Sequence, residues 1–213
     1  MQPIDVLIVD DHEIVRLGIR RLLEEAGFSV AEADSGETAL QLIRDGVRPR
    51  VVLMDIQMPG IGGLEATRRL LAQAPEQRII ILTVITDGPL PRALLRAGAH
   101  GYITKGCSVD EMTRAIRRVA AGARYISSEV AQSLALSLLD GDGESPFDRL
   151  SARELQFVVL LSQGLRNNAI ASTMNVSAKT VSTYRARAAT KLGVTSEAQI
   201  IRLALEHGVV GRA

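Results

Sequence analysis

Short apolar runs separated by helical patterns constrain the fold of the first 122 residues most strongly. Three runs, Val6–Val9, Val51–Met54 and Ile79–Leu82, are continuous and rich in β-branched residues, which is typical of parallel strands buried on both faces. Phe28–Ala33 and Gly101–Thr104 are weaker strand candidates. Helical patterns lie between and after these strands, at residues 12–26, 36–45, 62–73, 88–97 and 108–122. Five β-α repeats predict a doubly wound, five-stranded parallel sheet with helices on both faces.

The chain has 213 residues, which is enough for two small domains. A further helical pattern spans 127–139, and residues 140–148 then contain four acidic residues and no basic one, as expected of a flexible acidic linker. Residues 149–213 contain nine Lys or Arg and three Asp or Glu, and this basic block favours a polyanionic partner. These features predict one domain over 1–122, a connecting helix and linker over 123–148, and a second domain over 149–213.

The second domain has the pattern of a small all-α unit. Four helical patterns, at 151–163, 166–174, 177–192 and 196–207, are joined by turns of two or three residues, and this arrangement predicts a helix-turn-helix. Ser151 and Glu154 have the spacing of a capping box, in which both side chains accept hydrogen bonds from backbone N–H groups at the start of a helix.

Several protein classes are disfavoured. The single Cys107 excludes an internal disulfide and a Cys-based zinc site, and we expect it to be a partly buried packing residue. Residues 1–10 lack the basic region that begins a signal peptide, and no apolar run approaches the length of a membrane span. The cytoplasm is the expected compartment.

Polar side chains follow the ends of four predicted strands. Asp10 and Asp11 follow the first strand, Asp55 follows the third, Thr83 comes at the end of the fourth, and Lys105 follows the fifth. Because an open parallel sheet binds ligands at the carboxyl ends of its strands, we expect these side chains to converge. Three neighbouring carboxylates repel one another and need a cation, and ligands that are all oxygen favour Mg²⁺.

Asp55 is the central carboxylate and the candidate phosphoacceptor. A carboxylate is a competent nucleophile toward phosphorus and forms an aspartyl-phosphate. The backbone carbonyl of Gln57 is a further candidate metal ligand, while Lys105 would pair with one phosphoryl oxygen and Thr83 would donate a hydrogen bond to another. We expect His12 to start the first helix rather than to bind metal, because no second His or Cys lies near it.

Residues 4 to about 122 resemble the receiver domain of response regulators, which has a flavodoxin-like fold. The resemblance is carried by Asp10-Asp11-His12, the stretch 51–60, Gly63-Leu64-Glu65, Thr83 and Tyr102-Ile103-Thr104-Lys105. It implies that a sensor histidine kinase phosphorylates Asp55. It also implies that Asp10, Asp11, Asp55 and the Gln57 carbonyl surround Mg²⁺, and that Thr83 and Tyr102 form a switch pair.

The predicted helix 177–192 has one apolar and one polar face. Val181, Ala188 and Leu192 lie on one stripe, which we expect to face the core. On the other side, basic and hydroxyl residues suit contacts with phosphates, and Arg185 suits either a guanine edge or a phosphate. The candidate DNA-contacting residues are Lys179, Thr180, Ser182, Thr183, Tyr184, Arg185 and Arg187.

Residues 149–210 resemble the LuxR-type helix-turn-helix of the NarL/FixJ response regulators. The motifs that carry this resemblance are Leu150–Glu154, Gly164, Asn167, Ile170-Ala171, Val176-Ser177, Lys179–Val181 and Lys191–Val194. It implies that helix 177–192 enters the major groove of promoter DNA, and that helix 196–207 contributes to a homodimer. Asn168-Ala169 stands where many members have Lys-Glu, and Ser182 where a Lys is common, so two charged groups of other members are absent.

Nearly the whole chain resembles the GacA/UvrY-type global regulators. The additional motifs are Thr83–Pro91, Tyr125-Ile126 with Ala131-Gln132, Ser145–Phe147 and Thr180–Arg187. This resemblance implies a hybrid sensor kinase as phosphodonor and promoters of small regulatory RNAs as targets. The chain is therefore expected to be a transcriptional response regulator and not an enzyme.

Three alternatives remain at this stage. An aspartyl-phosphate phosphatase usually has an acid two residues after its nucleophile, but Gln57 holds that position and transfers no proton. A stand-alone protein-binding signalling module does not account for the basic helix-turn-helix. An RNA-binding output lacks the stacking aromatic residues that RNA readers use.

Overall fold

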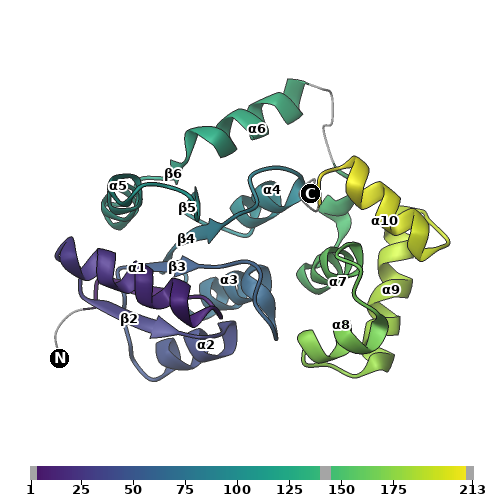
Figure 1. The fold of residues 1–213 in the computed structure, drawn as a ribbon, viewed down its shortest axis with the longest axis horizontal. Coiled ribbons are helices and arrows are strands. Elements are labelled where there is room, and N and C mark those ends of the chain that lie inside the picture. The colour runs from purple at the N-terminus through teal and green to yellow at the C-terminus, as the bar shows by residue number, and fades with distance from the viewer. Residues whose placement is uncertain (1–3, 140–144, 210–213) are drawn as a thin grey trace. The chain divides into compact units, whose positions relative to one another are not determined.

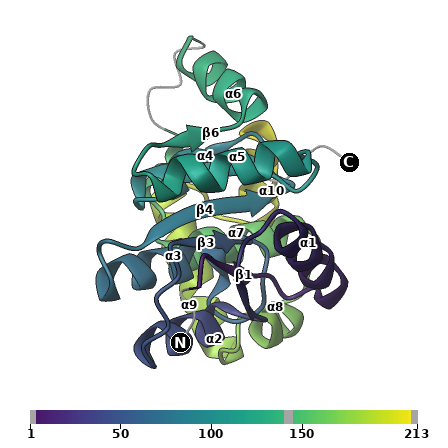
Figure 2. The ribbon, with the colours of Figure 1, turned by 90° about the vertical axis from the view of Figure 1, so that its left-hand side faces the viewer.

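The computed structural model describes residues 4–139 and 145–209. It divides into two compact units (Figures 1 and 2). One unit comprises the chain up to Val84 together with Leu94–Val130, and the other comprises Ile85–Ala93 together with the chain from Ala131 onward. Within the residues described, no helix has both the length and the apolar character that crossing a lipid bilayer requires.

A parallel sheet forms the centre of the first unit. Its strand order is β2-β1-β3-β4-β5-β6, and each neighbouring pair runs parallel. The strands are β1 (Val6–Val9), β2 (Val30–Ala33), β3 (Val51–Met54), β4 (Arg78–Thr83), β5 (Gly101–Thr104) and β6 (Tyr125–Ile126). The predicted doubly wound α/β architecture is confirmed.

The prediction of five strands was wrong, because β6 adds a sixth at the edge of the sheet. Only two residues form this strand, so no apolar run marks it in the sequence. Tertiary pairing creates it: the N–H of Tyr125 donates to the carbonyl of His100, and the N–H of Ser127 donates to the carbonyl of Tyr102.

Five helices separate the strands, and a sixth follows β6. They are α1 (Glu13–Glu25), α2 (Gly36–Arg44), α3 (Gly62–Gln73), α4 (Pro89–Arg96), α5 (Val109–Ala120) and α6 (Ser128–Leu139). All six lie within two residues of the predicted ranges. The fourth helix begins at Pro89, where the missing backbone N–H would have had no partner within the helix.

Alternate residues of the strands build separate cores on the two faces. On one face, Val6, Ile8, Val51 and Leu53 pack with residues of α1 and α5; this is the side that faces the viewer in Figure 2. The intervening residues, such as Leu7, are also fully buried. Strands buried on both faces explain why these runs are continuously apolar instead of alternating.

The C-terminal part of the second unit is helical, as predicted. Its elements are the 3-10 helix η1 (Pro146–Arg149), α7 (Ala152–Ser162), α8 (Asn167–Thr173), α9 (Ala178–Leu192) and α10 (Glu197–Glu206). The capping box of Ser151 and Glu154 is present at the start of α7. Ser177 and Ser196 cap α9 and α10, and α9 ends at Gly193 in the left-handed conformation.

The end of the predicted flexible linker is structured. Residues 140–144 lie outside the described part of the chain, but Pro146–Arg149 form η1, and the oxygen of Ser145 accepts a hydrogen bond from the N–H of Phe147. Phe147 is buried, and its ring meets the ring of His207 edge-on with centroids 5.7 Å apart. The prediction of a flexible linker was wrong for residues 146–148, where acidic composition gave no sign of a 3-10 helix with a buried Phe147.

Candidate functional site

The register of the central strands brings the predicted carboxylates together. Val9 pairs with Met54 in the parallel β1/β3 ladder, so Asp10 and Asp55 follow adjacent strands at the same level. The N–H of Asp55 donates to the carbonyl of Val9 at 2.9 Å, and the N–H of Asp10 donates to the carbonyl of Ala33 at 3.2 Å. Backbone pairing therefore fixes where both side chains begin.

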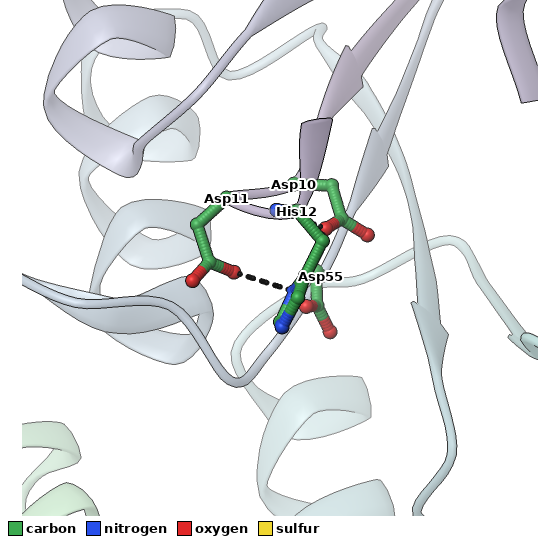
Figure 3. Close-up of side chains that lie close together, drawn as sticks. All are labelled: Asp10, Asp11, His12 and Asp55. Atoms are coloured by element: carbon green, nitrogen blue, oxygen red, sulfur yellow. Dashed lines mark hydrogen bonds and ion pairs between the residues drawn. The ribbon is translucent and has the colours of Figure 1, made fainter. Parts of the chain in front are cut away.

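Three carboxylates and the imidazole of His12 lie close together at this edge and are called here the carboxylate cluster (Figure 3). Potential ligand atoms of Asp10, Asp11, His12 and Asp55 all lie within 4.8 Å of one another. Asp10 and Asp55 are buried, with 1% and 3% of their surface exposed, while Asp11 is partly exposed. Burial at this spacing makes their mutual repulsion strong, because water screens it poorly.

Lys105 compensates part of this negative charge. Its Nζ lies 2.7 Å from Oδ2 of Asp10 and 2.8 Å from Oδ2 of Asp55. Its backbone N–H donates to the carbonyl of Thr83, which anchors the residue just after β5. The predicted lysine is thus within reach of any group attached to Asp55.

The electrostatics of the cluster favour binding a cation. Burial raises the pKa of Asp55, and the nearby charge of Asp10 raises it further, although Lys105 acts in the opposite direction. Burial lowers the pKa of Lys105, but hydrogen bonds and charge interactions with Asp10 and Asp55 outweigh it and raise that pKa overall. The cluster therefore holds more negative charge than a single lysine neutralises.

The donor set fits a hard divalent cation. Oδ1 of Asp11 is buried and accepts no hydrogen bond from the residues that the structure describes. Such an orphaned carboxylate oxygen is costly unless a cation or water satisfies it. Nδ1 of the exposed His12 lies 3.2 Å from this oxygen, and His12 immediately precedes α1, as predicted. Carboxylate oxygens with one backbone carbonyl suit Mg²⁺ better than a softer metal.

The loop after β3 holds Asp55 in place. Oδ1 of Asp55 accepts hydrogen bonds from the N–H of Ile56 at 2.7 Å and from the N–H of Gln57 at 3.4 Å. The side chain of Gln57 is exposed, so its backbone is the part that lies beside the carboxylate. These bonds leave Oδ2 directed toward Lys105.

Two residues outside the predicted site support this loop. A Cβ atom on Gly63 would lie 2.0 Å from the carbonyl oxygen of Asp55, so α3 approaches β3 more closely than any side chain permits. Oε1 of Glu37, on α2, accepts a hydrogen bond from the N–H of Ile61 at 3.0 Å. Sequence reasoning missed the role of Glu37, because it is separated from the loop by 24 residues and no local pattern marks it.

Thr83 and Tyr102 are both fully buried. Thr83 comes at the carboxyl end of β4 and pairs in register with Thr104 of β5, while Tyr102 pairs with Ile81. Thr83 therefore lies at the same edge as Asp10 and Asp55, and Tyr102 lies within the neighbouring strand. In this structure the ring of Tyr102 is part of the interior.

Helix α9 presents the predicted polar face. Val181 and Ala188 are buried and Leu192 is partly buried, which places the apolar stripe against the core. The predicted DNA-contacting set divides by exposure. Its exposed members are Lys179, Ser182, Thr183 and Arg187, and its partly exposed members are Thr180, Tyr184 and Arg185.

Several of these side chains already have local partners. The hydroxyls of Ser182 and Thr183 donate to backbone carbonyls one turn earlier in α9, at 3.0 and 3.1 Å. The hydroxyl of Thr180 lies 2.8 Å from that of Ser177. Arg185 forms an ion pair with Glu197 of α10 at 2.7 Å. A contact of these side chains with another molecule would therefore have to replace existing hydrogen bonds or ion pairs.

An ion pair between a buried carboxylate and an exposed lysine ties α9 to α7. Oε2 of Glu154 accepts hydrogen bonds from Nζ of Lys191 at 2.6 Å and from the N–H of Ser151 at 2.7 Å. Burial raises the pKa of Glu154, but the bonds from Lys191 and Ser151 outweigh it and lower that pKa overall. The same carboxylate completes the capping box of α7 and holds Lys191 of α9.

Comparisons with known proteins agree with both halves of this description. Residues 6–117 match the family described as the response regulator receiver domain. Residues 148–204 match the family described as bacterial regulatory proteins of the luxR family. The first match contains the whole carboxylate cluster, and the second contains all of α9.

Curated relatives resemble the chain over nearly its whole length. The response regulator GacA of Pseudomonas aeruginosa is 47% identical over 99% of both chains. The response regulator UvrY of Escherichia coli K12 is 47% identical over 97% of this chain and 95% of its own.

Solved structures of similar proteins include one with DNA. RcsB of Salmonella enterica serovar Typhimurium, bound to the promoter P1flhDC in the presence of the phosphomimetic BeF3-, is 25% identical, with a TM-score of 0.67 over 95% of this chain and 98% of its own. A LuxR-family response regulator from Aurantimonas sp. is 38% identical, with a TM-score of 0.60 over 63% of this chain and 97% of its own.

Proposed function

Because the chain belongs to the response regulators that join a receiver domain to a LuxR-type DNA-binding domain, we propose that phosphorylation of Asp55 controls its binding to DNA. Family membership makes it a DNA-binding transcription regulator activated by phosphorylation, and not an enzyme. The phosphatase and the stand-alone signalling module are therefore set aside. The domain limits 1–122, 123–148 and 149–213 are part of this proposal.

The carboxylate of Asp55 is the nucleophile in the proposed reaction. One of its oxygens forms a bond to phosphorus, while the bond between phosphorus and the imidazole nitrogen of a kinase phosphohistidine breaks and its electron pair stays on that nitrogen. Hydrogen bonds from the backbone of Ile56 and Gln57 orient the carboxylate. Lys105, at 2.8 Å, then pairs with an oxygen of the transferred group.

We assign the metal site to the carboxylates of Asp10, Asp11 and Asp55 and to the backbone carbonyl of Gln57. When bound to these ligands, Mg²⁺ would neutralise negative charge on the phosphoryl group. Oδ1 of Asp11 supports this assignment, because it is buried, accepts no hydrogen bond from the described residues, and has His12 Nδ1 at 3.2 Å. Thr83 and Tyr102 are assigned to the switch, in which the hydroxyl donates to the phosphoryl group and the aromatic ring adjusts behind it.

Helix α9 is the proposed recognition helix. We assign phosphate contacts to Lys179, Thr180 and Arg187, and readout of a guanine edge to Arg185. The remaining members of the DNA-contacting set, Ser182, Thr183 and Tyr184, lie between these residues on α9. A single helix-turn-helix binds weakly, so we propose that phosphorylation promotes a homodimer that occupies two half-sites of promoter DNA. A sensor histidine kinase of the hybrid type is the proposed phosphodonor. Because the protein has to reach both this kinase and promoter DNA, the cytoplasm is its proposed compartment.

The observation that carries the proposal is the buried Asp55 carboxylate, held between Lys105 and the other acids of the cluster. The test is to measure dimerisation by ultracentrifugation and DNA binding with and without beryllofluoride in the presence of Mg²⁺. The DNA probe is a duplex selected by the wild-type chain from a random-sequence pool. Wild type should dimerise and bind more tightly when beryllofluoride is added, and Asp55→Ala should not respond.

Asp45→Ala is the matched control, because it removes an exposed carboxylate at the end of α2, away from the cluster. It should respond like wild type. A response retained in Asp55→Ala would refute Asp55 as the switch. Equal DNA binding in all samples, with no effect of beryllofluoride, would refute the coupling between phosphorylation and DNA binding.

A further inference from the structure

An ion pair joins the proposed recognition helix to the helix that follows it. Nη1 of Arg185, on α9, lies 2.7 Å from Oε1 of Glu197, in the first turn of α10. Nη2 of the same guanidinium lies 3.4 Å from the hydroxyl oxygen of Ser182. The side chain that is proposed to read a guanine edge is therefore held from two sides before DNA arrives.

Stability does not explain this pair. The side chains of Arg185 and Glu197 are 38% and 46% exposed, and exposed ion pairs contribute only about 0–1 kcal/mol to folding. Ser196 already caps α10 through a hydrogen bond to the N–H of Gln199, so Glu197 is not needed to start that helix. The pair instead affects how much positive charge Arg185 presents and in which direction its side chain points.

Among the basic residues of the DNA-contacting set on α9, Glu197 pairs with Arg185. Across residues 4–139 and 145–209, neither Lys179 nor Arg187 lies within 4 Å of a carboxylate. These two remain available to any phosphate, whatever the sequence of the DNA. Arg185 differs, because a phosphate contact must first replace a short bond to a carboxylate, and because the carboxylate itself repels the DNA backbone.

A guanine base differs from a phosphate in that its acceptors are uncharged and lie in one fixed plane. A guanidinium binds O6 and N7 of guanine through two parallel N–H donors, and a guanidinium whose plane is already fixed loses less side-chain entropy when it forms them. Of its five N–H donors, Glu197 and Ser182 engage two. The remaining N–H donors of Arg185 stay available to a base edge, and the bonds to Glu197 and Ser182 fix their orientation.

We propose that Glu197 is a specificity-determining residue of the DNA interface: it positions Arg185 and withholds its charge from phosphates, so that Arg185 adds affinity at a matching base and little elsewhere. The inference rests on the proposed function, in which α9 is the recognition helix. Loss of the carboxylate then frees Arg185 for sequence-independent contacts.

The test compares the full-length wild type with Glu197→Gln, an isosteric change that removes the charge. Both bind, with beryllofluoride and Mg²⁺ present, to the selected duplex and to a shuffled duplex of the same composition, over a series of salt concentrations. For Glu197→Gln, affinity for the shuffled duplex should rise about 3- to 10-fold, and the ratio of the two affinities should fall by a similar factor. One additional phosphate contact should steepen the salt dependence on the shuffled duplex by about 0.9 in the logarithmic slope.

Glu206→Gln is the matched control, because it removes the same charge from the same helix but from a pair with Arg202 at 3.6 Å. It should leave the affinity ratio and the salt slope unchanged. Equal effects of Glu197→Gln and Glu206→Gln would overturn the proposal and reduce Glu197 to a contribution to net charge.

The Arg185→Ala background separates this inference from the proposed function. If Glu197 acts through Arg185, adding Glu197→Gln to Arg185→Ala should change neither the ratio nor the slope. A full effect of Glu197→Gln in that background would overturn the proposal while leaving α9 as the recognition helix. If Arg185→Ala binds both duplexes as wild type does, the assignment of Arg185 to the DNA interface itself fails.

Discussion

Replacing Gly63 by alanine tests whether the close approach of α3 to β3 holds the phosphoacceptor in place. The new Cβ would lie 2.0 Å from the carbonyl oxygen of Asp55 and 2.7 Å from the Cα of Ile56. An unstrained contact between carbon and oxygen needs about 3.3 Å, so the helix and the strand must separate by roughly 1.3 Å. Both colliding groups are backbone, and therefore no side chain can rotate to relieve the contact.

The energetic cost follows from this geometry. Overpacking of a core costs about 1–3 kcal/mol, and a clash between backbone atoms belongs at the upper end. The higher helix propensity of alanine returns about 1 kcal/mol. The net loss of about 2 kcal/mol should lower the melting temperature by roughly 4–8 °C. Because the displaced atom belongs to Asp55, an error of about 1 Å should also slow its phosphorylation roughly 10- to 100-fold.

The assay follows thermal unfolding by circular dichroism and phosphorylation by acetyl phosphate through the increase in intact mass. Gly18→Ala is the control, because Gly18 lies in α1 and a Cβ atom added there would meet no other atom within 4 Å. It should stabilise the protein by about 1 kcal/mol and leave phosphorylation unchanged. If Gly63→Ala melted and reacted like wild type, the close approach would not be what holds Asp55.

Three further predictions concern carboxylates, two of them buried (Asp55 and Glu154) and one exposed (Glu37). Burial raises the pKa of Asp55 in the folded state, so ionisation of this carboxyl group destabilises the fold as pH rises. Without Mg²⁺, Asp55→Asn should therefore raise the melting temperature at pH 7. Below about pH 4, where Asp55 is protonated in both states, the substitution should not raise it. Hydrogen bonds lower the pKa of Glu154, so its stabilisation is present above about pH 4.3 and is lost as pH falls through the folded pKa. Lys191→Met should therefore cost about 1–3 kcal/mol in urea unfolding at neutral pH and less in acid, and a pH-independent cost would contradict this account. Glu37→Ala should slow phosphorylation of Asp55, because it removes the acceptor that holds the loop at Ile61. Glu37→Gln keeps an acceptor oxygen and should react like wild type. Equal rates in all three proteins would show that the loop needs no support from α2.

Much of the fold of both domains was predictable because it follows from local patterns. Strands such as Val51–Met54 are buried on both faces, so their residues are continuously apolar, and the capping residues Ser151 and Ser177 mark helix starts within a few residues of themselves. The β-α alternation also predicts that Asp10 and Asp55 lie at the same edge, because all parallel strands end there. No such pattern exists for β6, which depends on pairing with β5.

The sequence by itself determined which chemical groups the protein brings to its sites: the acids after β1 and β3, the lysine after β5, and the basic and hydroxyl residues of α9. Spacing along the chain reports these, because strand ends and helix faces repeat at fixed intervals. Only the tertiary structure decided how those groups are held. The support of Ile61 by Glu37, the contact of Gly63 with the backbone of Asp55, and the pairs Glu154–Lys191 and Arg185–Glu197 all join different elements of the fold. Such contacts depend on the packing of one element against another, which leaves no periodic signal in either.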